Sequence, residues 1–202
     1  NLAYVLLQQG QMAEAERHYR AVLDERLRLQ GHLHFDVRTA VRNLRIALRT
    51  QKKFADALAY TRLDIDLTRK ATGAFSVDVA QALTRLGLLY GDLGEQSEAE
   101  SAFRESAETF VAASAYESVD SALALFYVAR QQLRQGCLEA AERTYHESMT
   151  LYRQLLGNEN SDVADILYGL GMVKQKSGQR SAAEKLLLEA LTMRRRVLGD
   201  SH

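Results

Sequence analysis

The stretch SVDVAQALTRLGLLYGDLG, residues 76–94, returns in its pattern of residue types every 42 residues along the chain. Aspartates keep this step at Asp36, Asp78, Asp120 and Asp162, and glycines keep it at Gly94, Gly136 and Gly178. The 202 residues divide into one truncated unit and four whole ones, 1–34, 35–76, 77–118, 119–160 and 161–202. A fixed period of this size is typical of stacked-repeat proteins. We therefore expect a single repeat array over 1–202.

Each unit is predicted to contain two amphipathic helices. Within 78–93, apolar residues return at intervals of three and four, as on one face of a helix. First helices are expected near 1–9, 36–51, 78–93, 120–135 and 162–177, and second helices near 12–29, 54–70, 96–113, 138–155 and 180–197. Gly94 separates two such helices at a position where positive φ suits glycine.

The links and the packing positions follow from the same alignment. His34, Ser76, Ser118 and Asn160 stand where first helices begin, so we expect them to act as N-caps. Ala115 stands where the other links have glycine, which predicts a longer helix or a distorted turn there. Close helix contacts are expected at Ala15, Ala57, Ala99, Ala141 and Ala183, and an apolar wall at Leu2, Leu44, Leu86, Val128 and Leu170.

Composition limits the classes of function. The formal net charge is zero, which argues against a general nucleic-acid or membrane-surface binder. No apolar run reaches the length of a membrane span, and a single cysteine excludes an intramolecular disulfide framework. His32 and His34 form an H-x-H pair with no third ligand at metal-binding spacing, so we expect no metal and no cofactor. No catalytic constellation is present, and we expect a cytoplasmic protein that is not an enzyme.

These residues resemble the tetratricopeptide repeat (TPR) family, in the 42-residue form of kinesin light chains. The family pattern is complete in one unit, as Leu83, Leu86, Gly87, Tyr90, Ala99 and Phe103. The resemblance covers the whole chain and implies an all-α, right-handed superhelical solenoid of stacked antiparallel helix pairs, with first helices lining a concave groove. Arg45 replaces the usual glycine or alanine, and Lys52-Lys53 replaces a link glycine. Groove asparagines survive only at Asn1 and Asn43, so a kinesin-like cargo motif is not expected.

Carrying the family's groove positions over gives a predicted partner-binding surface. Its residues are Arg42, Asn43, Ile46, Arg49, Gln81, Thr84, Arg85, Leu88, Phe126, Tyr127, Arg130, Arg134, Tyr168, Met172 and Lys176. Aromatic and arginine side chains are the types that anchor partners, which makes Phe126, Tyr127 and Tyr168 the strongest candidates. The alternative for each ring is packing against the next unit.

Charge is uneven along the chain, with +5 in unit 35–76 and −6 in unit 77–118. Arg38, Arg42, Arg45 and Arg49 share one helix face. Two readings stay open: a solvated face with weak inter-repeat ion pairs, or an arginine-lined groove end that takes an acidic or C-terminal carboxylate group.

The sequence thus favours a non-catalytic scaffold that binds a peptide or partner protein, acidic or aromatic-apolar in character, in the concave groove. The alternative is the regulatory or docking region of a larger bacterial signalling enzyme such as a kinase, ATPase or protease. RNA reading by helical repeats is disfavoured by the zero net charge. The terminal repeats lack polar capping faces, so end-to-end self-association is also expected.

Overall fold

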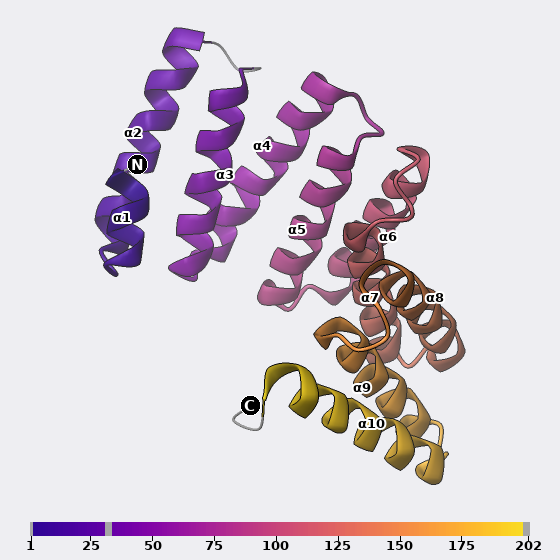
Figure 1. Cartoon of the computed structure of the whole chain (residues 1–202). Coiled ribbons are helices and arrows are strands. Elements are labelled where there is room, and N and C mark those ends of the chain that lie inside the picture. Colours follow the sequence, from indigo (N-terminus) through magenta and orange to yellow (C-terminus); the bar gives the residue numbers. More distant parts are fainter. Residues whose placement is uncertain (1, 31–33, 200–202) are drawn as a thin grey trace. The chain divides into compact units, whose positions relative to one another are not determined.

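The computed structural model describes residues 2–30 and 34–199, and over these residues it contains ten helices and no strand. The helices are α1 (Leu2–Gln8), α2 (Met12–Gln30), α3 (Phe35–Thr50), α4 (Phe54–Thr72), α5 (Val77–Leu93), α6 (Gln96–Ala112), α7 (Val119–Gln135), α8 (Leu138–Leu156), α9 (Ser161–Lys176) and α10 (Arg180–Leu198) (Figure 1). Each bound lies within two residues of the predicted one. The all-α class is confirmed.

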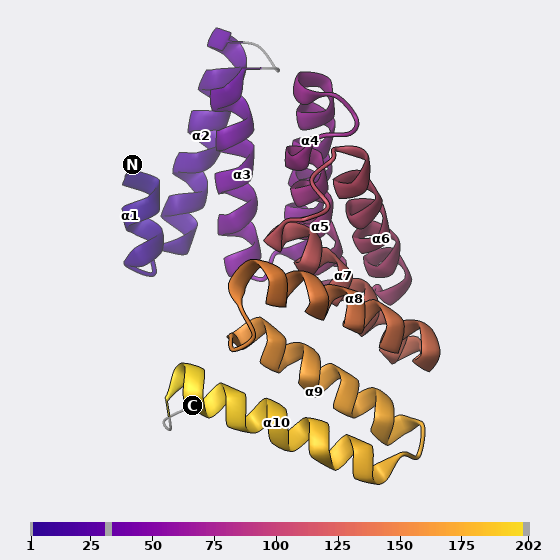
Figure 2. The same ribbon diagram turned by 45° about the vertical axis from the view of Figure 1, so that its right-hand side comes forward.

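The chain forms two compact units, Asn1–Ala102 and Phe103–His202, and the division falls within α6. In the first unit each helix from α1 to α5 packs on the next, and in the second the same holds from α7 to α10. Both ribbon views show neighbours such as α2 and α3, or α9 and α10, side by side and antiparallel (Figures 1 and 2). Each unit is therefore a stack of helical hairpins.

The predicted close contacts are confirmed. Ala15, Ala57, Ala99 and Ala141 are fully buried and Ala183 nearly so. In the apolar wall, Leu44, Val128 and Leu170 are buried and Leu86 is half-buried. The prediction was wrong for Leu2, which is 60% exposed, because no described helix packs on that side of α1.

Side-chain caps begin the first helices as the alignment predicted. Ser76, Ser118 and Asn160 accept hydrogen bonds from the backbone N–H groups of Val79, Ser121 and Val163. The His34 ring accepts one from the Asp36 N–H, at 3.2 Å. His32, the other histidine of the predicted pair, lies outside the described residues.

The link after α6 differs from the others, as expected, but not by a longer helix. Gly73, Gly157 and Gly199 end the second helices α4, α8 and α10 with φ near +85° and ψ near 165°, a conformation essentially restricted to glycine. Because Ala115 cannot adopt it, α6 is 17 residues long where α4, α8 and α10 have 19. Ser114 takes φ +54° instead, and the Ala115 N–H donates to the Phe110 carbonyl. The distorted turn is confirmed, and the longer helix was wrong.

Candidate partner-binding surface

In the first unit, one hollow lies between the first helices α1 and α3. Its lining residues are Tyr4, Gln8, Tyr19, Asn43, Ile46 and Thr50. Of these, Asn43 and Ile46 were predicted, and Ile46 is 46% exposed. Tyr4 was missed, although the repeat gives a signal for it: Tyr4 stands one 42-residue period before Ile46.

Two predicted arginines of α3 hold carboxylates of neighbouring helices. The Arg42 Nε donates to both oxygens of Asp64 on α4, at 3.0 and 3.3 Å, and Asp64 is only 1% exposed. The Arg49 Nε donates to the Asp92 Oδ2 on α5, at 2.7 Å. Part of the arginine charge is therefore used to join helices, in agreement with the first of the two readings of this face.

A second hollow of the first unit contains a different arginine. We call it the Arg45 pocket; its lining residues are Arg45, Ile46, Arg49, Thr50, Lys52, Phe54 and Asp92. The Arg45 side chain is buried, and its Nε has no hydrogen-bond partner. Burial, together with the positive charges of Arg85, Arg49 and Arg42 and against the attraction of Asp64, lowers the pKa of Arg45 to about 10. Arg45 is still cationic at neutral pH.

The predicted residues of α5 are less available than those of α3. Gln81, Arg85 and Leu88 are half-buried. Thr84 is 7% exposed, and its hydroxyl donates to the Ala80 carbonyl one turn earlier. Thr84 is therefore less accessible to a partner than Gln81, Arg85 and Leu88.

In the second unit, Phe126, Tyr127 and Arg130 of α7 form one ring cluster. The Tyr127 ring stacks on Phe103 with centroids 4.7 Å apart and planes inclined by 14°, and the Phe126 ring lies 5.9 Å from Tyr145. The Arg130 guanidinium lies 4.7 Å from the Tyr127 ring centroid, within cation–π range. Both rings are half-buried, so they contribute to packing as well as to the surface.

The third candidate ring, Tyr168 on α9, remains 49% exposed. Its neighbour is Arg194 of α10, whose guanidinium lies 5.9 Å from the ring centroid. Of the other predicted residues in this unit, Met172 is half-buried, and Arg134 and Lys176 are exposed. Tyr168 is thus the most accessible aromatic anchor of the predicted set.

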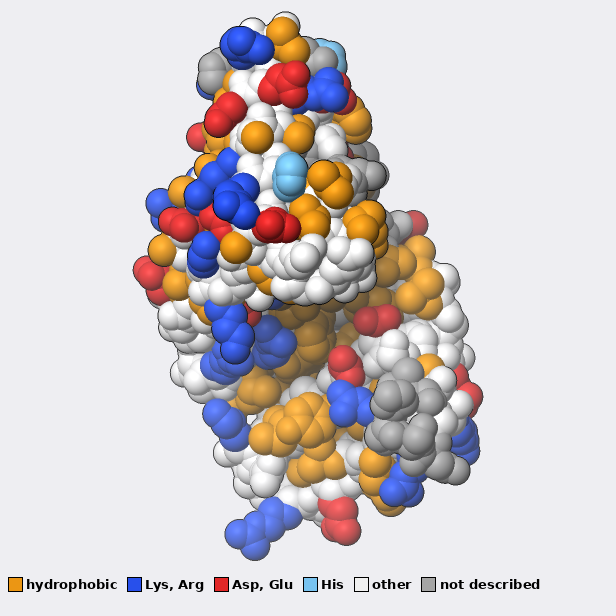
Figure 3. Space-filling model, turned by 90° about the vertical axis from the view of Figure 1, so that its left-hand side faces the viewer, with side chains coloured by type: hydrophobic (Ala, Val, Ile, Leu, Met, Phe, Trp, Pro, Cys, Tyr) orange, Lys and Arg blue, Asp and Glu red, His pale blue; other side chains and the backbone are white. Residues whose placement is uncertain are grey.

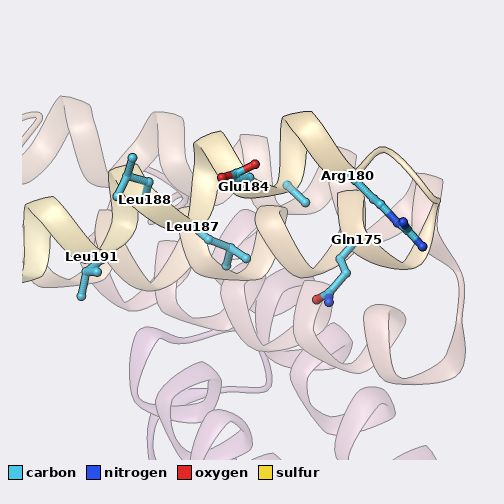
Figure 4. A pocket seen from close by; sticks show the side chains of 7 residues that line it. Gln175, Arg180, Glu184, Leu187, Leu188 and Leu191 are labelled. Atoms are coloured by element: carbon cyan, nitrogen blue, oxygen red, sulfur yellow. The ribbon is translucent and has the colours of Figure 1, made fainter.

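The outer side of α10 carries an apolar surface that the groove prediction did not include. Figure 4 shows Leu187 and Leu191 toward one edge of α10 and Leu188 and Glu184 toward the opposite edge, with Arg180 at the start of the helix and Gln175 on the neighbouring α9. Leu191 is 44% exposed, whereas Met149 and Ile65, which precede it by one and three periods, are 9% and 4% exposed. A position that is buried in earlier repeats is therefore open on α10.

Neither a metal-binding group nor a membrane-spanning helix is found in the part of the chain that the structure describes. Within it, no group of three His, Cys, Asp or Glu side chains could hold a metal ion. Over the same residues, no helix has both the length and the apolar character to cross a bilayer.

The space-filling view shows exposed hydrophobic patches between groups of Lys and Arg side chains (Figure 3). Such a surface suits contacts with other proteins.

Stacked helical hairpins of 42-residue period define a helical-repeat protein, and apolar and aromatic side chains are exposed on its first helices. Three family models described as tetratricopeptide repeat match residues 1–36, 80–109 and 120–196, more than two thirds of the chain together. The chain belongs to the tetratricopeptide repeat family. A comparison with curated proteins found no match.

Solved structures support the same fold. BtubC (BKLC) from P. vanneervenii has a TM-score of 0.83 and 20% identity, with 100% of this chain and 80% of that one covered. A Podosopora anserina protein, described as a kinesin light chain with nearly identical TPR-like repeats, has a TM-score of 0.80 and 17% identity, covering 96% and 92%. YrrB, a TPR protein with an unusual peptide-binding site, has a TM-score of 0.62 and 17% identity, covering 96% and 83%. Identities this low show the fold alone.

Proposed function

We propose that this chain is a non-catalytic scaffold whose first helices bind a peptide segment or a partner protein, in the groove that membership of the TPR family implies. The observation that carries the proposal is the exposure of Ile46 on α3 and Tyr168 on α9, at 46% and 49%. The repeat core does not need these side chains, since it is closed by the buried alanines and leucines of both helices. Exposed side chains of this kind anchor partners.

The other predicted residues support this role to different degrees, because some are exposed and others are half-buried. Asn43 lies beside Ile46 in one hollow, while Phe126, Tyr127 and Arg130 present the outer edges of a packed cluster. Arg134, Met172 and Lys176 complete the surface in the second unit, and Gln81, Arg85 and Leu88 complete it in the first. The peptide-binding site named for YrrB supports a peptide as the ligand. We propose that the five sequence units act as one array.

The test is selection from a random peptide library on the immobilised 202-residue protein, followed by affinity measurements on purified variants. Ile46→Glu and Tyr168→Glu place a charge where an apolar partner group would sit, so each should weaken the selected peptide at least tenfold, about 1.4 kcal/mol. Val22→Glu on α2 and Val111→Glu on α6 make the same change at exposed positions of second helices. Equal losses for all four variants, or none for Ile46→Glu and Tyr168→Glu, would contradict the proposal.

We further propose that the open side of α10 takes a second copy of the chain end to end. Ile65 in the first compact unit and Met149 in the second stand at the position of Leu191 in their own repeats. Both are covered by the first helix of the next repeat, α5 and α9 respectively. The first helix α1 exposes Leu2 and Val5, although Leu44 and Ala47, one period later, are fully buried. Sedimentation velocity should show association that grows with concentration and is lost in Leu191→Glu. A monomer at all concentrations would refute the contact.

A further inference from the structure

The first compact unit exposes apolar side chains at one of its ends. Because α2 to α5 pack as antiparallel neighbours, the ends of α2 and α4 and the starts of α3 and α5 lie at the same end of this unit (Figures 1 and 2). We call the apolar side chains exposed there the apolar tip; they are Leu29, Phe35, Phe75 and Val77. Among the described residues, Phe75 at 70% and Leu29 and Phe35 at 64% have the highest exposures of any large hydrophobic side chain.

The repeat does not require the two phenylalanines of the apolar tip. One and two periods after Phe75 stand Glu117 and Glu159, and three periods after Phe35 stands Ser161. These three polar residues are exposed as well. The fold therefore accepts a charged or polar side chain at both positions, and the exposed rings of the first unit serve its surface rather than its core.

Cationic side chains stand in the same turns as the apolar tip. The Arg38 guanidinium lies 5.9 Å from the Phe35 ring centroid, and the Arg26 Nη1 donates to the Asp36 Oδ2 at 2.8 Å. In the last turns of α2 and α4 and the first turns of α3 and α5, the cations are Arg28, Arg38, Arg69 and Lys70, and the carboxylates are Asp36 and Asp78. Salt screens charges beyond about 8–10 Å, so this local excess of cations matters more to a nearby surface than the zero net charge of the chain.

The shape and the chemistry of the apolar tip fit a lipid surface. None of its four side chains lines the Arg45 pocket or the hollow between α1 and α3. A fluid bilayer accepts projecting apolar side chains without a matching cavity, and Phe and Leu enter the boundary between its headgroups and acyl chains. Lys and Arg side chains beside them are attracted to anionic headgroups. Charge complementarity therefore selects a bilayer that contains anionic lipid.

We propose that the apolar tip docks the first unit on the surface of an anionic membrane. Phe35 and Phe75 enter the headgroup boundary, and the cations of the adjoining turns contact the lipid headgroups. The inference goes beyond the proposed peptide binding and uses none of the residues assigned to it. The two functions can therefore be tested separately.

The first experiment exploits the absence of tryptophan from the chain, since a single introduced tryptophan then reports its own surroundings. Phe75→Trp places it in the apolar tip, and Val22→Trp places it at an exposed position in the middle of α2. Each protein is mixed with vesicles of three parts phosphatidylcholine to one part phosphatidylserine, and with vesicles of phosphatidylcholine alone. Only Phe75→Trp with the phosphatidylserine vesicles should show emission at shorter wavelength and protection from a water-soluble quencher.

Vesicle flotation of further variants tests the apolar and the charged parts of the contact. Phe75→Glu, the change that the repeat itself makes at positions 117 and 159, should weaken binding about tenfold or more, because it removes the burial of a phenylalanine side chain. Arg28→Gln should weaken binding to the phosphatidylserine vesicles about fivefold. Arg17→Gln is the matched control, since it removes an exposed charge at the other end of α2 and should leave binding unaltered.

The inference is overturned if the wild-type protein does not float with phosphatidylserine vesicles, or if phosphatidylcholine alone binds it equally well. Unaltered emission of Phe75→Trp on bound vesicles, or wild-type binding by Phe75→Glu, would also overturn it. If vesicles fail to bind and Phe75→Glu instead weakens the library-selected peptide, the tip contacts a protein partner and the membrane contact is refuted. The Ile46 and Tyr168 variants are measured without lipid, so failure of the groove function is seen independently.

Discussion

Lys52 is a single residue held in a conformation that the repeat reserves for glycine. It has φ +59°. The glycines at the same position of the other 42-residue repeats have φ between +77° and +83°; they are Gly10, Gly94, Gly136 and Gly178. A side chain in the left-handed region costs roughly 1–2 kcal/mol, partly offset by the greater chain entropy of glycine.

Lys52→Gly should therefore stabilise the protein by about 0.5–1 kcal/mol. The measurement is urea unfolding followed by circular dichroism. Gly94→Ala creates the same backbone strain in the next repeat, and it should lower the free energy of unfolding by a similar amount. A Lys52→Gly variant that is less stable than the wild type would show that the lysine side chain contributes more than its backbone costs.

Gln131 on α7 is fully buried, and neither its amide nitrogen nor its amide oxygen has a hydrogen-bond partner. The corresponding residues of other first helices, Ala47, Leu89 and Val173, are apolar and buried. Gln131→Leu should raise the free energy of unfolding by about 1–3 kcal/mol, because it removes an unsatisfied buried amide. The reverse change, Leu89→Gln, should lower it. Unaltered stability in Gln131→Leu would mean that the amide is satisfied in solution.

Residue types alone could not separate packing from binding. Phe126, Tyr127 and Tyr168 look equivalent in the sequence, yet Tyr127 stacks on Phe103 and Phe126 packs at an inclined angle on Tyr145, while Tyr168 stays open. The difference depends on which side chains the neighbouring helices bring, and no local pattern contains that information. The unusual arginine at position 45, in contrast, was visible as a departure from the repeat.

At the scale of helices, the repeat predicted positions well because each boundary has a local cause. Ser76, Ser118 and Asn160 supply cap oxygens, and the glycines supply positive φ. The α6 end was less predictable, since losing one glycine allows several substitute turns. Residue sizes at two facing positions of the repeat also vary together. In the last repeat the two residues are Gly171 and Leu187, and a Cβ at Gly171 would lie 2.8 Å from the Leu187 side chain. Three periods earlier the same two positions hold the larger Arg45 and the smaller Thr61.

Glu16 joins helices in the first unit and makes their stability depend on pH. Its carboxylate accepts from the Lys53 Nζ at 2.7 Å and pairs with Arg20 at 2.9 Å. Burial raises the pKa of Glu16, but hydrogen bonds from Lys53 and Gln51 and the charge of Arg20 outweigh it and hold the pKa below the ordinary value of 4.5.

Because the folded-state pKa is the lower one, this stabilisation is complete above pH 4.5 and is lost as pH falls through the folded-state value. Glu16→Gln should cost about 1–3 kcal/mol at pH 7, and the cost should shrink on acidification. Urea unfolding from pH 7 down to pH 3 measures both. A gap between wild type and variant that stays constant with pH would contradict the assignment.

At the scale of the whole molecule, the side chains that could bind a partner lie on the surfaces of the two stacks of hairpins, because the side chains inside the stacks pack against one another. The core is closed by small and aliphatic side chains of both helices in each unit, so exposed apolar groups on first helices and on α10 are available for partners. Family membership and fold followed from the period of the sequence. Which apolar side chains of the first helices and of α10 stay exposed could be seen only in the folded chain.

The most direct test of the central claim is site-specific photo-crosslinking with a peptide selected on the wild-type protein. A photoreactive phenylalanine analogue is placed in turn at Ile46 and Tyr168 on first helices, and at Val22 and Val111 on second helices. We predict crosslinks to the peptide from positions 46 and 168 and none from 22 and 111. Crosslinks mainly from 22 and 111 would contradict the account and place binding on the second helices.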